Sequence, residues 1–388
     1  MAAACAGVRE DCDGYALVVC DWSNLHYTTH ASKADRVELS SRRDLGYELL
    51  TALVVSDRDG SPLAPVALEL RAQEGVYTTR SDPITAAMSP LDGLDPMMRH
   101  VDTLPLGRPR VYIIDREADS VAHYRQWAGA GRTVLIRAND ARRVRHGERE
   151  RTLVAIAKEM AQTRQLRATR EVAFKGQRAW QFVGQTQVVL HRPARTHRVV
   201  GRGKKRRWRH KNIPGAALPL RLVVCEVRAA DGKLLARWLL LSNAPGAVSA
   251  ATLALWYYWR WRIESYHKLI KGAGLHIEQW LQDDAGALSK RLAVAAMAAV
   301  VVWKLARDER PQAREMRHTL VRLSGRQIKR GKNRPAFTIP ALLAGLGVLL
   351  PMLYLLDTYR LDDLRRLAQA TLPHALLPPS LAPDDDSG

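Results

Sequence analysis

One segment in the second half of the chain combines four side chains suited to phosphate chemistry. Residues 256–271 read WYYWRWRIESYHKLIK. In a helix, with about 100° between successive residues, a phenol, a guanidinium, a carboxylate and an ammonium would share an arc of about 60°. They belong to Tyr257, Arg260, Glu264 and Lys271. A simple i, i+4 ion pair between Arg260 and Glu264 would leave the other two residues unexplained.

This helix face suits work on a phosphodiester. Glu264 can contribute to a site for divalent metal ions, while the cations and the phenol beside it bind phosphate oxygens. Two Mg²⁺ ions would activate the attacking oxygen and stabilise the leaving oxygen of an in-line displacement. His267 and Lys268 flank the same arc and are further candidates for DNA contact. Because one glutamate cannot hold two ions, further carboxylates are needed.

Two aspartates at the ends of apolar runs can supply them. Asp21 follows ALVVC, and Asp115 follows VYII. If the two strands pair side by side, both carboxylates can project toward one point. Aspartate also ends many strands as a turn or helix cap, so each signal alone is weak. Glu117 and Asp119 lie close to Asp115, and we expect them to start and cap the following helix.

The elements that must position these acids read as a mixed sheet with helices. The chain begins with three strands and DRDGSP turn chemistry, then continues strand–helix–strand, which indicates an α/β fold with helices packed on a mixed sheet. The expected strands are residues 15–22, 46–57, 62–72, 110–115 and 133–137, and the expected helix is 117–130. Residues 78–107 are expected to form a polar loop.

The rest of the chain divides by composition into a basic, β-rich stretch and a helical one. Strand candidates at 180–190 and 220–227 alternate with basic loops, and residues 191–211 contain ten Lys or Arg and no acid. After Val248 the pattern is helical, and the polar tail PPSLAPDDDSG is expected to be disordered. We therefore expect a first part of the core at 1–138, a β-rich insertion at 139–245, the remainder of the core at 246–310 and a helical region at 311–388.

The charge balance indicates a polyanionic partner. Sixty Lys and Arg against 39 Asp and Glu give a net charge of +21. Nucleic acid is the favoured partner, because a basic protein gains affinity by releasing counterions from phosphates; an anionic membrane surface is the main competitor. Four cysteines without a CxxC pair predict reduced, buried thiols in a cytoplasmic protein. The N-terminus lacks the features of a signal peptide.

One apolar stretch is long enough to be weighed as a membrane span. Residues 339–356 have about the right length for a span. They contain Pro340, Gly345, Gly347 and Pro351, which favour a buried helical pair. We therefore expect no membrane partner.

Three motifs together resemble those of a known family. The spacing Tyr257-x2-Arg260-x3-Glu264-x6-Lys271 is similar to the signature of the insertion-sequence-four transposases, the relatives of the Tn-five transposase. DREAD at 115–119 resembles their second acidic motif, and DWSNL at 21–25 resembles the first. The matches occur in the family's order across roughly residues 15–275.

The resemblance implies a ribonuclease H-like core whose catalytic, metal-binding triad is Asp21, Asp115 and Glu264, with Mg²⁺ as the cofactor and Mn²⁺ as a substitute. It implies cleavage of double-stranded DNA at transposon ends through a hairpin intermediate, followed by joining to target DNA. It also implies a nucleoid-associated bacterial protein that is a homodimer on DNA, with 342–356 as a candidate dimerisation helix. Trp238 resembles the tryptophan that receives a flipped base, although a tryptophan packing an edge strand is the alternative. Arg137 occupies the place of an arginine that meets DNA.

The chain departs from the family pattern at its beginning. Family members carry a DNA-recognition domain before the first acidic motif, whereas 20 residues precede Asp21 here. We expect that domain to be missing, through truncation or a mis-assigned start. A catalytically silent DNA-binding or regulatory fragment is therefore the alternative function. A nuclease or junction resolvase of the same fold would not be expected to carry the Tyr-Arg-Glu-Lys spacing.

Overall fold

The computed structural model describes residues 2–80, 90–200, 207–273, 275–326 and 336–371, with the side chains of 2, 3, 196–210 and 273 left out. The chain forms two compact units, one of residues 1–272 and 276–300 and the other of 273–275 and 301–388. The expected disordered tail lies outside the described residues, as do 201–206 of the basic loop and 81–89 of the expected polar loop.

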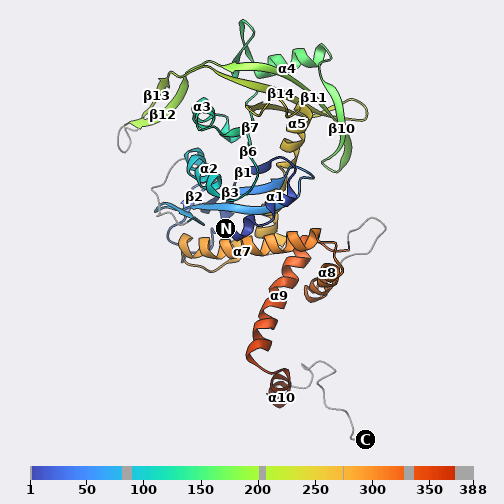
Figure 1. Cartoon of the computed structure of the whole chain (residues 1–388). Coiled ribbons are helices and arrows are strands. Elements are labelled where there is room, and N and C mark those ends of the chain that lie inside the picture. Colours follow the sequence, from blue (N-terminus) through green and yellow to red (C-terminus); the bar gives the residue numbers. More distant parts are fainter. Residues whose placement is uncertain (1, 81–89, 201–206, 274, 327–335, 372–388) are drawn as a thin grey trace. The chain divides into compact units, whose positions relative to one another are not determined.

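The first unit is built on a mixed sheet of 13 strands (Figure 1). Its main path runs β5-β4-β3-β1-β6-β7-β15-β14-β11-β8-β9, with β2 beside β3 and β10 beside β11. The β1–β6 and β6–β7 pairs are parallel, and the others are antiparallel. The strands are β1 Ala16–His26, β2 Val37–Glu38, β3 Leu45–Ser56, β4 Pro62–Arg71, β5 Val76–Thr78, β6 Arg110–Ile114, β7 Thr133–Arg137, β8 Arg143–His146, β9 Arg149–Thr152, β10 Arg167–Phe174, β11 Gln177–Leu190, β14 Leu218–Ala229 and β15 Leu234–Ser242. β12 Ala194–Val200 and β13 Arg207–Ile213 form a separate two-stranded ribbon.

The helices of the first unit are mostly short. They are α1 Val8–Asp11, α2 Leu94–Thr103, α3 Val121–Gly129, α4 Leu153–Gln162, α5 Ala250–Trp259, α6 Arg262–Lys268 and the start of α7 Ala285–Arg307. The expected α/β class, with a large mixed sheet and a helical C-terminal region, is confirmed. The strand predictions in the first third are confirmed too, because long β-branched runs are buried on both faces of the sheet.

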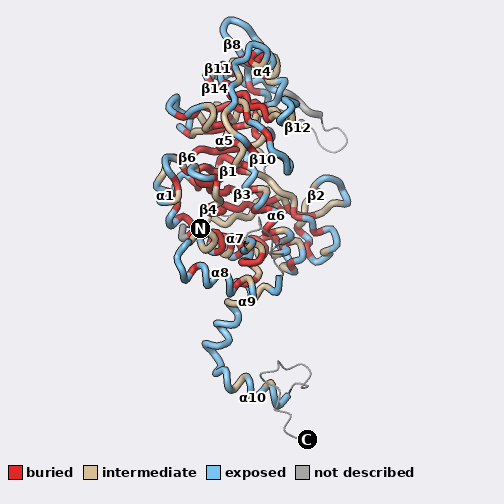
Figure 2. The backbone as a smooth tube through the Cα atoms, turned by 90° about the vertical axis from the view of Figure 1, so that its right-hand side faces the viewer, coloured by how far each residue is buried: buried red, intermediate tan, exposed pale blue. Residues whose placement is uncertain are grey.

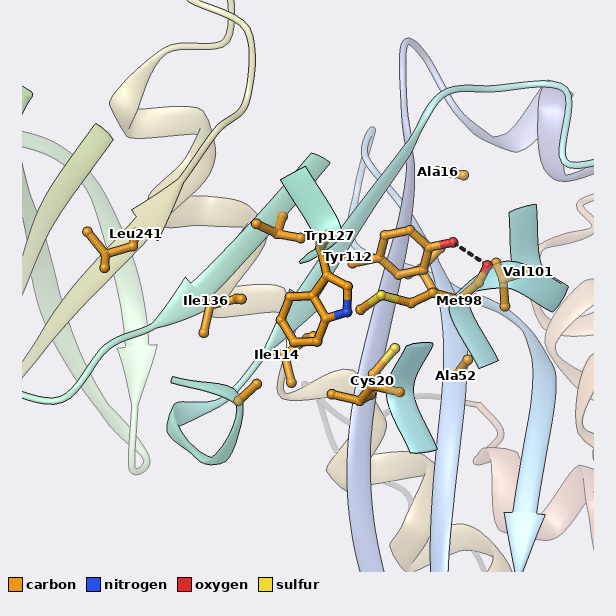
Figure 3. Packing of buried hydrophobic residues seen from close by; sticks show 14 of the residues in the cluster. Ala16, Cys20, Ala52, Met98, Val101, Tyr112, Ile114, Trp127, Ile136 and Leu241 are labelled. Atoms are coloured by element: carbon orange, nitrogen blue, oxygen red, sulfur yellow. Dashed lines mark hydrogen bonds between the residues drawn. The ribbon is translucent and has the colours of Figure 1, made fainter. Parts of the chain in front are cut away.

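One face of the sheet carries the main core. Alternate residues of β1, β3, β6, β7 and β15 point into a cluster that α2 and α3 cover. Figure 3 shows its centre, where Trp127 of α3 and Met98 of α2 pack over Tyr112 and Cys20. Tyr112 Oη also donates to the carbonyl of Met98 at 3.1 Å. All four cysteines are free and buried, as expected for reduced thiols.

The segment 139–245 extends this sheet. β15 pairs with β7, and β14 and β11 follow outward from it. The limits predicted at 138, 245 and 310 stay predictions; the compact units divide between Val300 and Val301, inside α7.

The second unit is helical, with α8 Pro311–Leu323, α9 Ile339–Thr358 and α10 Leu361–Thr371. Gly345 of α9 lies against the backbone of Leu320 so closely that a Cβ there would stand 2.0 Å from the Leu320 carbonyl oxygen. The Arg317 guanidinium lies 5.1 Å from the Phe337 ring centroid and donates to the carbonyl of Leu305.

Two expectations about apolar and polar stretches were wrong. Residues 339–358 form one helix; Pro340 falls in its first turn, where the missing N–H costs nothing, and Pro351 lies inside it. Beyond Val348 this helix is largely exposed (Figure 2), so it is not a buried pair. By length and composition, α7 and α9 could both span a membrane, which is weak evidence for a membrane partner. The expected loop 78–107 contains α2, whose Met97, Met98 and Val101 fill the core.

Candidate active site

The sheet brings Asp21 and Asp115 to the same face and the same edge. β1 and β6 are parallel neighbours, and their register aligns Cys20 with Ile114. Both of those residues point into the main core. Because side chains alternate along a strand, the next residues, Asp21 and Asp115, point to the opposite face.

The Arg260 guanidinium gathers three acids from distant parts of the sequence. Its Nη1 lies 2.8 Å from Asp21 Oδ2 and 3.9 Å from Glu264 Oε1, and its Nη2 lies 3.1 Å from Asp115 Oδ2. The residue is only 6% exposed. A buried guanidinium requires such partners, since a desolvated charge is costly unless it is paired. The structure thus brings the three acids together around one cation.

The helix that carries Arg260 and Glu264 is divided, which corrects the expectation of one continuous helix. α5 ends at Trp259, α6 begins at Arg262, and a π-helical turn follows from Leu269 to Ala273. The tight hydrogen bonds from Arg260 N to Tyr257 O and from Ile263 N to Arg260 O mark the junction. The regular 100° spacing therefore does not hold from Tyr257 to Lys271.

A turn of the sheet supports this junction. Gly60, between β3 and β4, has a φ of +72°, and a Cβ on it would stand 2.5 Å from the Trp259 ring. The Gly60 carbonyl also accepts from Arg262 Nε at 2.8 Å. Glycine is required at this position both for its left-handed backbone and for the close approach of the ring.

Asp115 is surrounded by donors. Its Oδ1 accepts from the Arg116 N–H at 2.7 Å and from Tyr257 Oη at 3.1 Å, and Arg137 Nη1 lies 3.6 Å away. Burial alone would raise the pKa of this carboxyl, but the charges of Arg260 and Arg137 and these hydrogen bonds together lower it. Asp115 is therefore ionised at neutral pH.

Asp21 is in a different electrostatic state. Burial is the largest influence and raises its pKa to about 6; Arg260 opposes this, while the charges of Glu264 and Asp115 add to it. A carboxyl whose pKa is raised toward neutral pH by burial and like charges is a recurrent feature of functional sites. An added cation would favour its ionised form.

Lys271 lies at the side of β1. Its Nζ donates to the Asn24 carbonyl and is 4.0 Å from Glu278 Oε1. Burial lowers the pKa of this ammonium, while Glu278 and Glu264 oppose the shift. The sequence pattern did not indicate Glu278, which also accepts from the His26 N–H at 2.9 Å; it stands in a helical turn with no motif of its own.

Trp238 stands beside the site, next to Tyr257. β7 pairs with β15 only from Leu240 to Ser242, and Trp238 is paired with Cys225 of β14 on the other side, so the alternative of a tryptophan packing an edge strand stays open. The Trp238 ring is half-buried, 5.5 Å from the Tyr257 ring and 6.4 Å from the Phe174 ring, centroid to centroid. Tyr257 therefore links the indole to Asp115.

His267 does not face the site, which corrects its assignment as a DNA contact. It is buried, and its Nε2 lies 3.2 Å from Thr51 Oγ1 on β3. Burial, with the nearby charges of Lys271 and Arg260, lowers its pKa to about 3, so the ring is neutral and inaccessible to phosphate. Lys268 is exposed, with Nζ 5.8 Å from the Trp261 ring centroid.

The acids next to Asp115 have other positions than expected. Asp119 does not cap the next helix, since α3 begins after Ser120. Its carboxylate, 3% exposed, accepts from the Asn139 N–H at 2.8 Å and pairs with Arg142 at 2.9 Å. Glu117 is exposed in a 3-10 turn. Only the first acid of DREAD reaches Arg260.

The three acids have the ligand chemistry, though not the spacing, of a site for a hard divalent cation. Three carboxylates already converge on a positive charge, and oxygen ligands of this kind are those that Mg²⁺ and Mn²⁺ prefer. In the part of the chain that the structure describes, no three acid, histidine or cysteine side chains stand at metal-ligand spacing, and the guanidinium lies among the acids.

No protein-family model matches the chain, and no curated protein is significantly similar to it.

Proposed function

We propose that this protein is a DDE-type transposase that cleaves double-stranded DNA at transposon ends and joins it to target DNA, with Mg²⁺ or Mn²⁺ as the cofactor. One observation carries the proposal: Asp21, Asp115 and Glu264 converge on one guanidinium, where the parallel pairing of β1 with β6 ends. Their order and motifs resemble those of the insertion-sequence-four transposases.

The order of the central strands supports a ribonuclease H-like core. β1, β3 and β4 form an antiparallel meander, and β6 and β7 follow in parallel on the other side of β1. Such a core places one acid on the first strand and one after the fourth, which are the places of Asp21 and Asp115.

In this proposal the three carboxylates hold the metal ions. The ions would polarise the phosphate and activate the attacking oxygen when bound. Arg260, freed from pairing with the acids, would bind a substrate phosphate, and Arg137 and the Tyr257 hydroxyl are placed beside Asp115 to do the same. Trp238, tilted by 59° against the Tyr257 ring, offers a plane for an unstacked base.

The protein's charge supports DNA as the partner. A net charge of +21 provides the counterion release that dominates DNA affinity. Nucleoid association and a homodimer on DNA belong to the same proposal.

A second function has one observation in its favour. Arg260 pairs with Asp21 and Asp115, and Arg137 lies 3.6 Å from Asp115, so these two aspartates have cationic partners in the fold without a metal ion. A protein that binds DNA without cutting it would retain this arrangement as an internal ion-pair cluster.

Cleavage of DNA under metal control distinguishes the two functions. Duplexes carrying candidate transposon ends should be nicked with Mg²⁺ or Mn²⁺ and remain intact with EDTA. The same assay is run with a fusion of the chain to a recognition domain, which should give the same result. Glu264→Gln should reduce nicking to the EDTA level. The matched control is Glu117→Gln, an exposed acid in the same region of the fold, which should cleave like the parent.

Two outcomes would contradict the enzyme. If Glu264→Gln cleaves as well as the parent, the site assignment is wrong. If neither the chain nor the fusion cleaves with either metal while DNA binding persists, the silent DNA-binding function stands instead.

A further inference from the structure

A large cavity opens at the edge of the sheet where β6 and β7 end, on the face that α3 covers. Its volume is about 1400 Å³, and it is bounded by the start of α3, the loop after β7 and the base of the β12–β13 ribbon. Arg116, which directly follows Asp115, lines it. Asn139, two residues beyond Arg137, lines it as well. The cavity therefore begins one residue along the chain from a proposed metal ligand.

Positive charge dominates the wall of this cavity. Five arginines line it against two aspartates. Asp119 is already paired with Arg142, and its carboxylate is turned away from solvent. Arg143 pairs with Glu150.

Two of the arginines can direct their charge to a ligand. Among the described residues, neither Arg116 nor Arg195 has a carboxylate within ion-pair distance, and both residues are exposed. They come from different elements that line the cavity: Arg116 follows β6, and Arg195 lies on β12. Unpaired guanidinium groups on two elements form a site for an anion that extends between them.

The size of the cavity favours a polymer over a small anion. Pockets for small ligands measure about 300–1,000 Å³ and are mostly apolar. This one is larger, and guanidinium groups are prominent on its wall. Guanidinium groups spaced along a groove suit successive phosphates of a backbone.

We propose that this cavity binds the sugar–phosphate backbone of a strand of the bound DNA. The identity of the strand rests on the proposed function, whereas the anion site rests on the cavity itself. Arg116 and Arg195 each contact a backbone phosphate, so they contribute to affinity without reading sequence.

The salt dependence of DNA binding tests this proposal without requiring cleavage. The full chain is titrated with a fluorescent random-sequence duplex in EDTA over a range of KCl concentrations. The slope of log K against log salt should become shallower by about 0.9 for each phosphate contact removed. Arg116→Ala and Arg195→Ala should each show this change, and the double variant about twice as much. Arg195→Lys, which keeps the charge, should restore most of the slope.

The control is Lys290→Ala, an exposed cation of α7 that does not line the cavity. Its slope should match that of the parent. Circular dichroism melts of all variants would show whether each is folded.

Three further outcomes distinguish the cavity proposal from its alternatives. Folded Arg116→Ala and Arg195→Ala proteins with the parent slope would overturn the cavity proposal, even if metal-dependent cleavage is found. If Arg116→Ala and Arg195→Ala lose binding to phosphatidylglycerol vesicles while their affinity for DNA stays that of the parent, the cavity proposal is overturned in favour of a lipid surface. A shallower slope in a protein that never cleaves would support the cavity and contradict the proposed enzyme.

Discussion

Replacing Arg260 by glutamine should lower the free energy of unfolding, because the three acids lose their shared cation. The guanidinium is the shared partner of Asp21 and Asp115, at 2.8 and 3.1 Å, and the closest cation to Glu264, at 3.9 Å. Glutamine keeps part of the volume and some hydrogen-bonding capacity but removes the charge. The acids then face one another with Arg137, 3.6 Å from Asp115, and the more distant Lys271 as the remaining cations.

The expected loss of stability follows from breaking buried pairs. Removing one partner of such a pair costs about 3–5 kcal/mol, because an uncompensated charge stays behind. The side chains of Asp21 and Asp115 are 13% and 26% exposed, so water screens part of the repulsion. We therefore expect the lower end of the range, about 3 kcal/mol at pH 8.

The loss should depend on pH with a definite sign. The pKa of Asp21 is about 6 in the folded chain, against about 3.9 when unfolded. Between these values the folded state binds more protons, so this group makes stability fall as pH rises, by about 3 kcal/mol in total. Arg260 lowers the pKa of Asp21, so without it the fall should extend above pH 6. The deficit of Arg260→Gln should thus be larger at pH 8 than at pH 5.

Urea denaturation of parent and variant at pH 5, 6.5 and 8, in EDTA and in Mg²⁺, measures these effects. A cation bound by the three acids stabilises the fold by about 2.7 kcal/mol at 100 times its Kd, and it should do so in Arg260→Gln. The matched control is Arg221→Gln. Arg221 is equally buried but donates to Gln185 and to the carbonyls of Pro245 and Val248.

The control variant should lose stability to the same extent at every pH and gain nothing specific from Mg²⁺. The reasoning would be refuted by an Arg260→Gln deficit that is the same at pH 5 and pH 8. Equal recovery of both variants with Mg²⁺ would also refute it.

Two other predictions concern stability. Burial lowers the pKa of His267 to about 3, so unfolding should become easier as pH falls below the unfolded value of about 6.5; His267→Gln should flatten this part of a urea–pH profile, and an unchanged profile would contradict it. Gly60→Ala should cost about 2–4 kcal/mol in urea titrations, because it combines a left-handed φ with overpacking against Trp259. Gly232→Ala, with a φ of +83° and open space around it, should cost about 1–2 kcal/mol; equal losses would argue against the Trp259 contact.

The sequence by itself determined the elements and the chemical candidates. Apolar runs such as 16–20 and 111–114 are strands because β-branched residues fill both faces of a central sheet. The same apolar runs are followed by Asp21 and Asp115, so both candidates could be read locally, although β1 continues past Asp21 to His26. The spacing from Tyr257 to Glu264 likewise identified the residues that gather at Arg260, since residues three and four apart share a helix face.

Only the tertiary structure decided which of these residues meet. The parallel pairing of β1 with β6, at a register that aligns Cys20 with Ile114, puts the two aspartates side by side; strand pairing is a long-range choice that local patterns do not encode. It also decided that Arg260 lies among the acids, a contact between residues 239 positions apart.

Burial was the other property that local patterns could not supply. His267 lies on the flank of the expected arc, yet it packs against Thr51 because the helix divides and turns toward β3. Asp119 resembles a helix cap by position, but the loop after β7 folds back to pair Arg142 with it. In both cases a neighbour far away in sequence sets the state of the side chain, since desolvation depends on everything that packs around a group.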